Sequence, residues 1–162
     1  RDKLVTGVQT CALPISAVPL DWVMLANSLT VMRHPPELLA FVERLATRGV
    51  AIINSAVFHA GFLVGGKYFD YRVADANNDA DRPLFAWRKS FVALCEAHGI
   101  SPMHACVQFG LSVPGVVAVA LNTSRAERVQ ENLAAVSTPV PPQFWASLKE
   151  EGLLANDYPY AG

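Results

Sequence analysis

Residues 116–132 read VVAVALNTSRAERVQEN, and they carry the clearest signal of the fold class. The first five residues form an unbroken apolar run, which is typical of a strand buried on both faces of a parallel sheet. A short polar turn follows. Ser124 and Glu127 then stand three residues apart, as in a capping box, and predict a helix that begins at about Arg125. A buried strand followed at once by a capped helix indicates an α/β protein.

The rest of the chain repeats this order of strand and helix. Two further apolar runs, 22–26 (WVMLA) and 50–53 (VAII), predict buried strands. Between the second and third strands lies a long loop rich in Gly, Asp and Asn. Helices are expected between Pro35 and Gly49, over 84–98, from Ser101 to just before Pro114, over about 125–135 with Val129 and Leu133 facing inward, and over 143–151.

Strands that alternate with helices predict a parallel sheet with right-handed crossovers. Three strands are few for such a sheet, because its first strand would expose an open edge. A closed (β/α)₈ barrel needs eight strands and roughly 250 residues. The sequence therefore suggests that further strands precede the first one seen here.

The N-terminal residues 1–16 are set apart from this reasoning. The segment VTGVQTCALPIS, residues 5–16, resembles the translation of a common sequencing-library adapter, so we expect it to be foreign to the gene. The native part would then cover residues 17–154. Residues 155–162 are rich in Tyr and Pro, and we expect them to form a loosely held tail.

Composition excludes several function classes. The 162 residues are 52% hydrophobic and 17% charged, and their net charge of −1 gives no electrostatic footprint for nucleic acid. No apolar run approaches the ~18 residues that span a bilayer, so we expect no membrane partner. The three cysteines match no metal or disulfide pattern, the Asp-rich loop lacks EF-hand spacing, and we expect a metal-free cytoplasmic protein.

The start of the helix after residue 120 is the first candidate site. The first turn of a helix offers unpaired N–H groups and a partial positive charge of about half a unit. Arg125 and Arg128 add charge beside it. A phosphate cradle and a plain capped surface helix are both compatible with this pattern.

This segment resembles the C-terminal signature of the aldo/keto reductase family. In that signature a strand ends in a short turn, and a helix with the pattern E-R/Q-x-x-E-N follows. The helix residues Glu127, Arg128, Glu131 and Asn132 match. The resemblance implies that Arg128 lies beside the adenosine of NAD or NADP and that Asn132 bonds its adenine. The other cofactor-binding residues that it implies are Leu121, Asn122, Thr123, Ser124 and Glu131.

Residues 54–66 (NSAVFHAGFLVGG) are similar to the end of the family's seventh strand and the loop after it. Ser55 matches there. Asn54 stands where many members place a tyrosine against the nicotinamide, and both are cofactor-site candidates. Phe58 and His59 are candidates for the wall of the sugar pocket. Residues 70–72 (DYR) and 144–154 (FWASLKEEGLL) are similar to the subgroup of L-fucose, D-threo-aldose and galactose dehydrogenases.

The resemblance implies a partial (β/α)₈ TIM barrel, with strands six to eight present and the N-terminal half missing. It implies an NAD(P)-dependent oxidoreductase that moves hydride between a sugar, or another small carbonyl compound, and nicotinamide. The family's catalytic Asp, Tyr, Lys and His lie on the first four strands, so we expect the fragment to be inactive. Asn122 replaces a lysine that binds the 2′-phosphate of NADP, which slightly favours NAD. A non-catalytic binding subunit, or a barrel enzyme that binds a phosphorylated substrate at Ser124 and Arg128, remains open.

Overall fold

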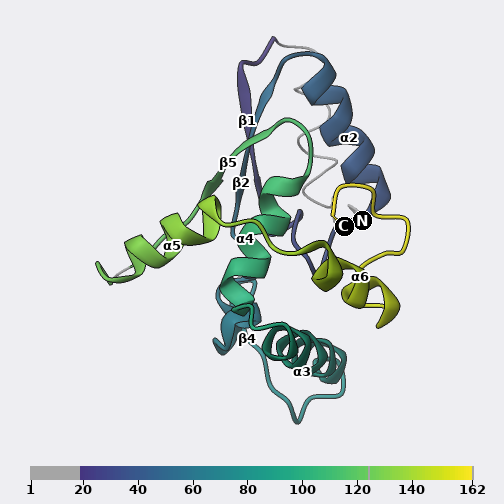
Figure 1. The fold of residues 1–162 in the computed structure, drawn as a ribbon, viewed down its shortest axis with the longest axis vertical. Coiled ribbons are helices and arrows are strands. Elements are labelled where there is room, and N and C mark those ends of the chain that lie inside the picture. The colour runs from purple at the N-terminus through teal and green to yellow at the C-terminus, as the bar shows by residue number, and fades with distance from the viewer. Residues whose placement is uncertain (1–18, 124, 162) are drawn as a thin grey trace, which may run out of the picture.

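The computed structural model describes residues 19–123 and 125–161. Three parallel strands form its main sheet in the order β1-β2-β5, and a small antiparallel hairpin, β3 with β4, lies in the long loop (Figure 1). In chain order the elements are β1 (Trp22–Ala26), α2 (Pro36–Thr47), β2 (Ala51–Ser55), the short 3₁₀ helix η1 (Phe62–Val64), β3 (Tyr68–Phe69), β4 (Arg72–Val73), α3 (Arg82–Ala97), α4 (Pro102–Ser112), β5 (Val116–Ala120), α5 (Arg128–Ser137) and α6 (Pro142–Glu150).

The parallel sheet and the five α-helices confirm the predicted α/β class and the order of the elements. The second strand lies one residue later than predicted at its start and extends to Ser55. The 3₁₀ helix and the hairpin were missed, because two-residue strands carry no periodic signal in a sequence. The described residues do not close into a barrel, since β1 and β5 are the edges of their three-stranded sheet.

Within residues 19–123 and 125–161, helices cover one face of the sheet and leave the other open. The register pairs Trp22 with Ala51 and Met24 with Ile53, so their side chains share one face, while Val23 and Ile52 share the other. Ile52 is fully buried, whereas Trp22 is 56% and Met24 48% exposed. The prediction that the first strand is buried on both faces was therefore wrong for the described chain.

Helix α2 packs closely on the covered face because of Gly115. A β-carbon at this position would lie 2.6 Å from the Ala46 β-carbon of α2. Gly115 also has φ +90°, a conformation that residues with a β-carbon rarely adopt. The turn into β5 therefore requires glycine.

Helix α5 projects from the body of the fold and packs mainly on α4 (Figure 1). Its side chains Val129 and Leu133 are 46% and 56% exposed, so the prediction that they face inward was wrong. The helical spacing correctly shows that they share a face. Within the described residues, however, no layer covers that face.

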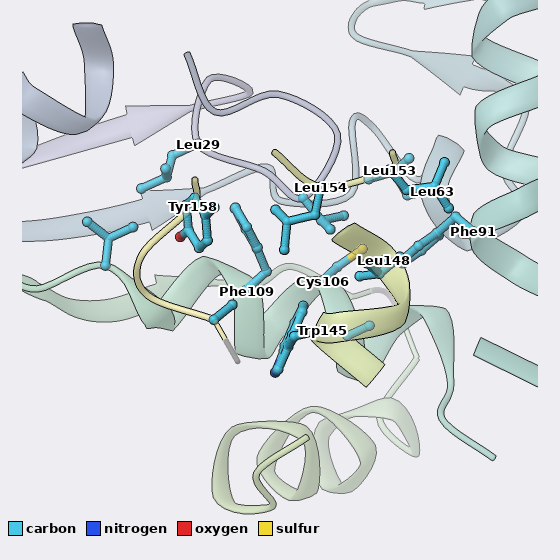
Figure 2. Close-up of a cluster of buried hydrophobic side chains, with 14 of the residues drawn as sticks. Leu29, Leu63, Phe91, Cys106, Phe109, Trp145, Leu148, Leu153, Leu154 and Tyr158 are labelled. Carbon is cyan, nitrogen blue, oxygen red and sulfur yellow. The ribbon is translucent and has the colours of Figure 1, made fainter. Parts of the chain in front are cut away.

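The core extends through the fold, and one part of it lies between α4, α6, the loop after β1 and the C-terminal segment (Figure 2). Phe109 of α4 is fully buried, and its ring stacks on Tyr158 with 4.8 Å between centroids. The Tyr158 hydroxyl lies 2.7 Å from the Ser112 hydroxyl. Residues 155–161 are thus held against the core and are not the loose tail that we expected, because Tyr158 buries an aromatic ring and satisfies its hydroxyl.

Candidate functional site

A cleft of about 1330 Å³ opens at the carboxyl ends of the three parallel strands. We call it the strand-end cleft. Ligands of parallel α/β proteins bind at this edge of the sheet, because the loops after the strands converge there. The lining comes from residues 26–27 after β1, residues 55–61 except His59, Val64, Tyr71, residues 101–104 at the start of α4, residues 120–123 after β5, Thr138, and Arg128, Glu131, Asn132, Ala134 and Ala135 of α5.

The structure brings most of the predicted cofactor residues together in this cleft. Six of the nine come from the β5 turn and α5, and a seventh is Ser55 at the end of β2. The Ser55 hydroxyl already donates a hydrogen bond to the Leu25 carbonyl at 3.0 Å. The six are Leu121, Asn122, Thr123, Arg128, Glu131 and Asn132.

The helix that carries this site begins later than predicted. Helix α5 starts at Arg128, with Glu127 as a cap residue whose side chain makes no capping hydrogen bond. The Thr123 hydroxyl instead accepts a hydrogen bond from the Arg125 N–H at 3.1 Å and so forms a local turn. Ser124, the other residue of the predicted capping box, lies outside the described residues.

The late start changes what the helix can offer to a phosphate. The Arg128 N–H donates to the Arg125 carbonyl at 3.2 Å, and the Val129 N–H donates to the Ala126 carbonyl at 3.1 Å. These two N–H groups are already hydrogen-bonded, so they are less available to a phosphate than the unpaired N–H groups of a usual first helical turn. The groups that this end of the cleft still offers are side chains, among them those of Arg128 and Asn132.

Asn54 does not line the cleft, contrary to the prediction. Its side chain is fully buried, and its amide N–H₂ donates to the Leu29 carbonyl at 2.9 Å and the Gly110 carbonyl at 3.2 Å. The pleat turns alternate residues to opposite faces, and Asn54 lies on the face toward α4. Asn54 thus joins β2 to α4 and the loop after β1, and it has no direct path to a cofactor.

Phe58 lines the cleft, but the neighbouring His59 does not. His59 is fully buried, with its Nδ1 2.7 Å from Asp70 Oδ1 and its Nε2 2.8 Å from the Thr30 hydroxyl. Its ring stacks on Phe69, with 4.8 Å between centroids. The prediction that His59 contacts a sugar was therefore wrong, because its ring points into the protein.

Sequence reasoning missed two parts of the cleft. Asn27 follows β1 with φ 55°, and its side-chain oxygen is buried without a hydrogen-bond partner in the described part of the chain. The start of α4 contributes Ser101, Met103 and His104. An Asn directly after a buried strand could have marked the first part. The start of α4 could not be recognised as part of a site, because its sequence has no distinctive polar pattern. Ser101 is explained by its role as the N-cap of α4.

The buried His59 and the half-buried His34 predict a dependence of stability on pH. Burial lowers the pKa of both His34 and His59 below the ordinary 6.5. Above pH 6.5 both groups are neutral in the folded and unfolded chains. Below it the unfolded chain binds more protons, so the free energy of unfolding should fall until the pH passes the lowered pKa values.

Urea unfolding at a series of pH values between 7.5 and 5 checks this prediction. The His98→Gln variant is the control, because His98 is exposed, and it should keep the full decline. A free energy of unfolding that stays constant over this interval would contradict it. A separate loss is expected near pH 3, since Arg72 holds the pKa of Asp81 at about 2, and Asp81 loses this pairing on protonation.

The described residues do not meet the requirements of a metal site, a reactive thiol or a membrane-spanning helix. Among residues 19–123 and 125–161, no three His, Cys, Asp or Glu side chains gather into a potential metal site. Cys95 and Cys106 are buried free thiols, and burial raises the pKa of Cys95 to about 12, so it is a poor nucleophile. None of the described helices has the length and apolar character needed to cross a membrane.

Comparison with known proteins agrees with this architecture. The model of the aldo/keto reductase family matches residues 11–151. The match starts inside residues 1–16, whose foreign origin stays a prediction. Pyridoxal 4-dehydrogenase of Microbacterium luteolum is 25% identical over 140 residues, which cover 84% of this chain and 39% of that protein. The chain therefore spans well under half the length of this relative. With strands, helices and strand-end cleft in the expected order and a family match over most of its length, the chain belongs to the aldo/keto reductase family.

Proposed function

We propose that this chain is the cofactor-binding part of an NAD(P)-dependent oxidoreductase. In this proposal the strand-end cleft holds the adenosine end of the nicotinamide dinucleotide. One observation carries the proposal: Asn122, Thr123, Arg128 and Asn132 line the same cleft at the carboxyl ends of the parallel strands. Family membership supports it, since aldo/keto reductases use nicotinamide cofactors.

The side chains of the cleft suit this ligand. The Arg128 guanidinium can lie flat against an adenine ring or donate to a phosphate. The Asn132 amide can pair with the donor and acceptor edge of adenine. Across the cleft, the buried oxygen of Asn27 needs a donor, which an N–H or O–H of the bound ligand would supply.

We propose NAD as the preferred cofactor. Asn122 stands where a lysine would neutralise the 2′-phosphate of NADP, and it carries no charge. Arg128 also lines the cleft and would have to serve the adenosine and the phosphate together. NAD has no 2′-phosphate, so Arg128 would need to contact only the adenosine.

The bound cofactor would exchange hydride at C4 of its nicotinamide with a small carbonyl or alcohol compound. We propose an aldose such as L-fucose, on the likeness of residues 70–72 and 144–154 to sugar dehydrogenases. The pyridoxal named for the relative is a second candidate. The apolar side chain of Phe58 could form one wall for either ring. We place no catalytic residue on this chain and expect it to have no turnover by itself.

Titration calorimetry with NAD, NADP, ADP and glucose 6-phosphate tests the proposal. NAD and ADP should bind at one shared site, NADP more weakly, and the sugar phosphate should not displace NAD. Binding of the sugar phosphate in competition with NAD would favour a barrel enzyme with a phosphorylated substrate. No binding of any nucleotide would contradict the proposal, and NAD-dependent oxidation of L-fucose by the chain alone would contradict the expected inactivity.

A further inference from the structure

Three loops meet at His59 beside the strand-end cleft. His59 belongs to the loop after β2, Thr30 to the loop after β1, and Asp70 to the turn of the β3–β4 hairpin. His59 is hydrogen-bonded to both partners, at 2.8 Å and 2.7 Å. A carboxylate can only accept, so His59 Nδ1 carries the proton and its Nε2 accepts from the Thr30 hydroxyl. We call these three residues the histidine clasp.

Thr30 and His59 of the clasp are enclosed, while Asp70 is partly exposed. Thr30 and His59 are both fully buried. Arg33 pairs with the other oxygen of Asp70 at 3.5 Å, and its backbone N–H donates to the Thr30 hydroxyl at 3.0 Å. Phe69 stacks on the imidazole from the hairpin. The imidazole of His59 is therefore too enclosed to contact a substrate directly.

The loop that the clasp holds has an unfavourable backbone. Ala56, His59 and Ala60 have φ values of 55°, 47° and 56°, and Asp70 in the facing turn has φ 47°. Such a conformation is unfavourable for a residue with a β-carbon and persists only where its surroundings fix it. Local turns supply some of this support, for example the bond from the His59 N–H to the Ala56 carbonyl at 3.1 Å. The hydrogen bonds from the His59 ring to Thr30 and Asp70 also hold this loop in place.

The strained loop forms one wall of the cleft. Ala56, Val57, Phe58 and Ala60 line it on either side of His59. Tyr71 directly follows Asp70 and also lines it, although its side chain is 92% exposed. The residues next to His59 and the residue after Asp70 thus line the cleft. The hydrogen bond between the two side chains therefore joins two parts of the lining.

We propose that His59 is a positioning residue, which together with Thr30 and Asp70 holds residues 56–60 and Tyr71 in the arrangement that lines the cleft. The inference rests on the proposed nucleotide site. It adds a specific dependence: ligand affinity requires the neutral, doubly hydrogen-bonded imidazole, although the imidazole never touches the ligand.

Protonation would weaken the clasp. A charged His59 would donate from both nitrogens, so the Thr30 hydroxyl could no longer donate to Nε2 and would keep only the Arg33 carbonyl, at 3.5 Å, as an acceptor. The charged and titratable groups facing the ring are Asp70, which favours the charged form, and Arg33, which opposes it. Arg72 lies against the far side of Phe69, at 6.0 Å from the centre of that ring. Burial of the ring outweighs the effect of Asp70, so the clasp is expected to be intact at neutral pH.

The test measures NAD affinity of the chain and of two clasp variants. NAD is the probe because its phosphates stay ionised between pH 7.5 and 5.5. Thr30→Val keeps the size of the side chain and removes only the hydroxyl that meets His59, and His59→Gln removes the imidazole. His98→Gln is the matched control, since the exposed His98 contacts the Ser147 hydroxyl, at 3.2 Å, and the edge of Phe144, and lies outside both the clasp and the cleft. Circular dichroism shows which variants remain folded.

If loss of the clasp leaves the lining arrangement populated about one-tenth of the time, the dissociation constant for NAD rises about tenfold at pH 7.5. In the wild-type chain and in His98→Gln the affinity should fall once the pH passes below the lowered pKa of His59, and in a folded His59→Gln it should be low throughout. Nitrogen chemical shifts of the wild-type imidazole should show a proton on Nδ1 and an acceptor at Nε2. Folded Thr30→Val with wild-type affinity would overturn the inference, as would an imidazole protonated on both nitrogens at pH 7.5.

The failure of the proposed function gives a different pattern. If the wild-type chain binds no NAD at any pH, the nucleotide site itself is wrong. If it binds NAD and both clasp variants bind it equally well, only the positioning role of His59 is wrong. Should His59→Gln fail to fold, Thr30→Val and the imidazole shifts still decide the inference.

Discussion

Replacing Phe109 by alanine is expected to lower the free energy of unfolding by about 3–5 kcal/mol. Phe109 is fully buried on α4 and lies between the ring of Trp145, at 6.3 Å, and that of Tyr158, at 4.8 Å (Figure 2). Its removal leaves a cavity where α4, α6 and the C-terminal segment meet. Since small domains are stable by only about 5–15 kcal/mol, this one change should bring the chain close to unfolding.

Urea unfolding followed by circular dichroism measures this loss. Leu133→Ala is the control, because it removes a comparable apolar side chain that is 56% exposed, and it should change the free energy of unfolding by under about 0.5 kcal/mol. Equal losses in both variants would show that the core does not lie where the packing of Phe109 places it.

Replacing Arg128 by alanine is expected to weaken NAD binding by about 10-fold to 100-fold. A hydrogen bond to a charged group contributes about 1.5–3 kcal/mol, and each 1.4 kcal/mol corresponds to a factor of ten in the dissociation constant. Arg128 is the arginine of the β5 turn and α5 that lines the strand-end cleft. The loss of NAD affinity should be smaller at high salt concentration. Salt screens the attraction between the Arg128 charge and the phosphates of NAD, so its removal then matters less.

Arg125→Ala is the matched control for this change. Arg125 lies three residues earlier, is exposed and does not line the cleft. Calorimetric titration of both variants should show a loss only for Arg128→Ala. If Arg128→Ala and Arg125→Ala lose NAD affinity equally, the effect comes from the change in net charge. The proposal that Arg128 contacts the ligand would then be wrong.

The sequence predicted the elements well and the faces of the elements poorly. Apolar runs and capping residues located the strands and helices, because these signals are local. Trp22, Val129 and Leu133 were expected to be buried, but their faces have no cover within the described residues. Burial depends on what packs against an element, and no local pattern contains that information.

The site was predicted in part, for a related reason. Arg128 and Asn132 lie at helical spacing after a strand, so their shared position in the cleft followed from local structure. Asn54 and His59 were misplaced, because a shift of one residue along a strand or turn moves a side chain from the cleft into the core. Asn27 was missed because its role comes from a positive φ and a buried oxygen, which three-dimensional packing creates.

The most direct test of the central claim is a titration of the ¹⁵N-labelled chain with ADP, followed by its amide spectrum. ADP carries the adenosine end without the nicotinamide, so it addresses the strand-end cleft alone. We expect saturable shifts at residues 55–58, 101–104, 121–123 and 128–132. Shifts that instead gather at residues 32–43 and 157–160, which line a separate surface hollow, or no saturable shifts at all, would contradict the claim.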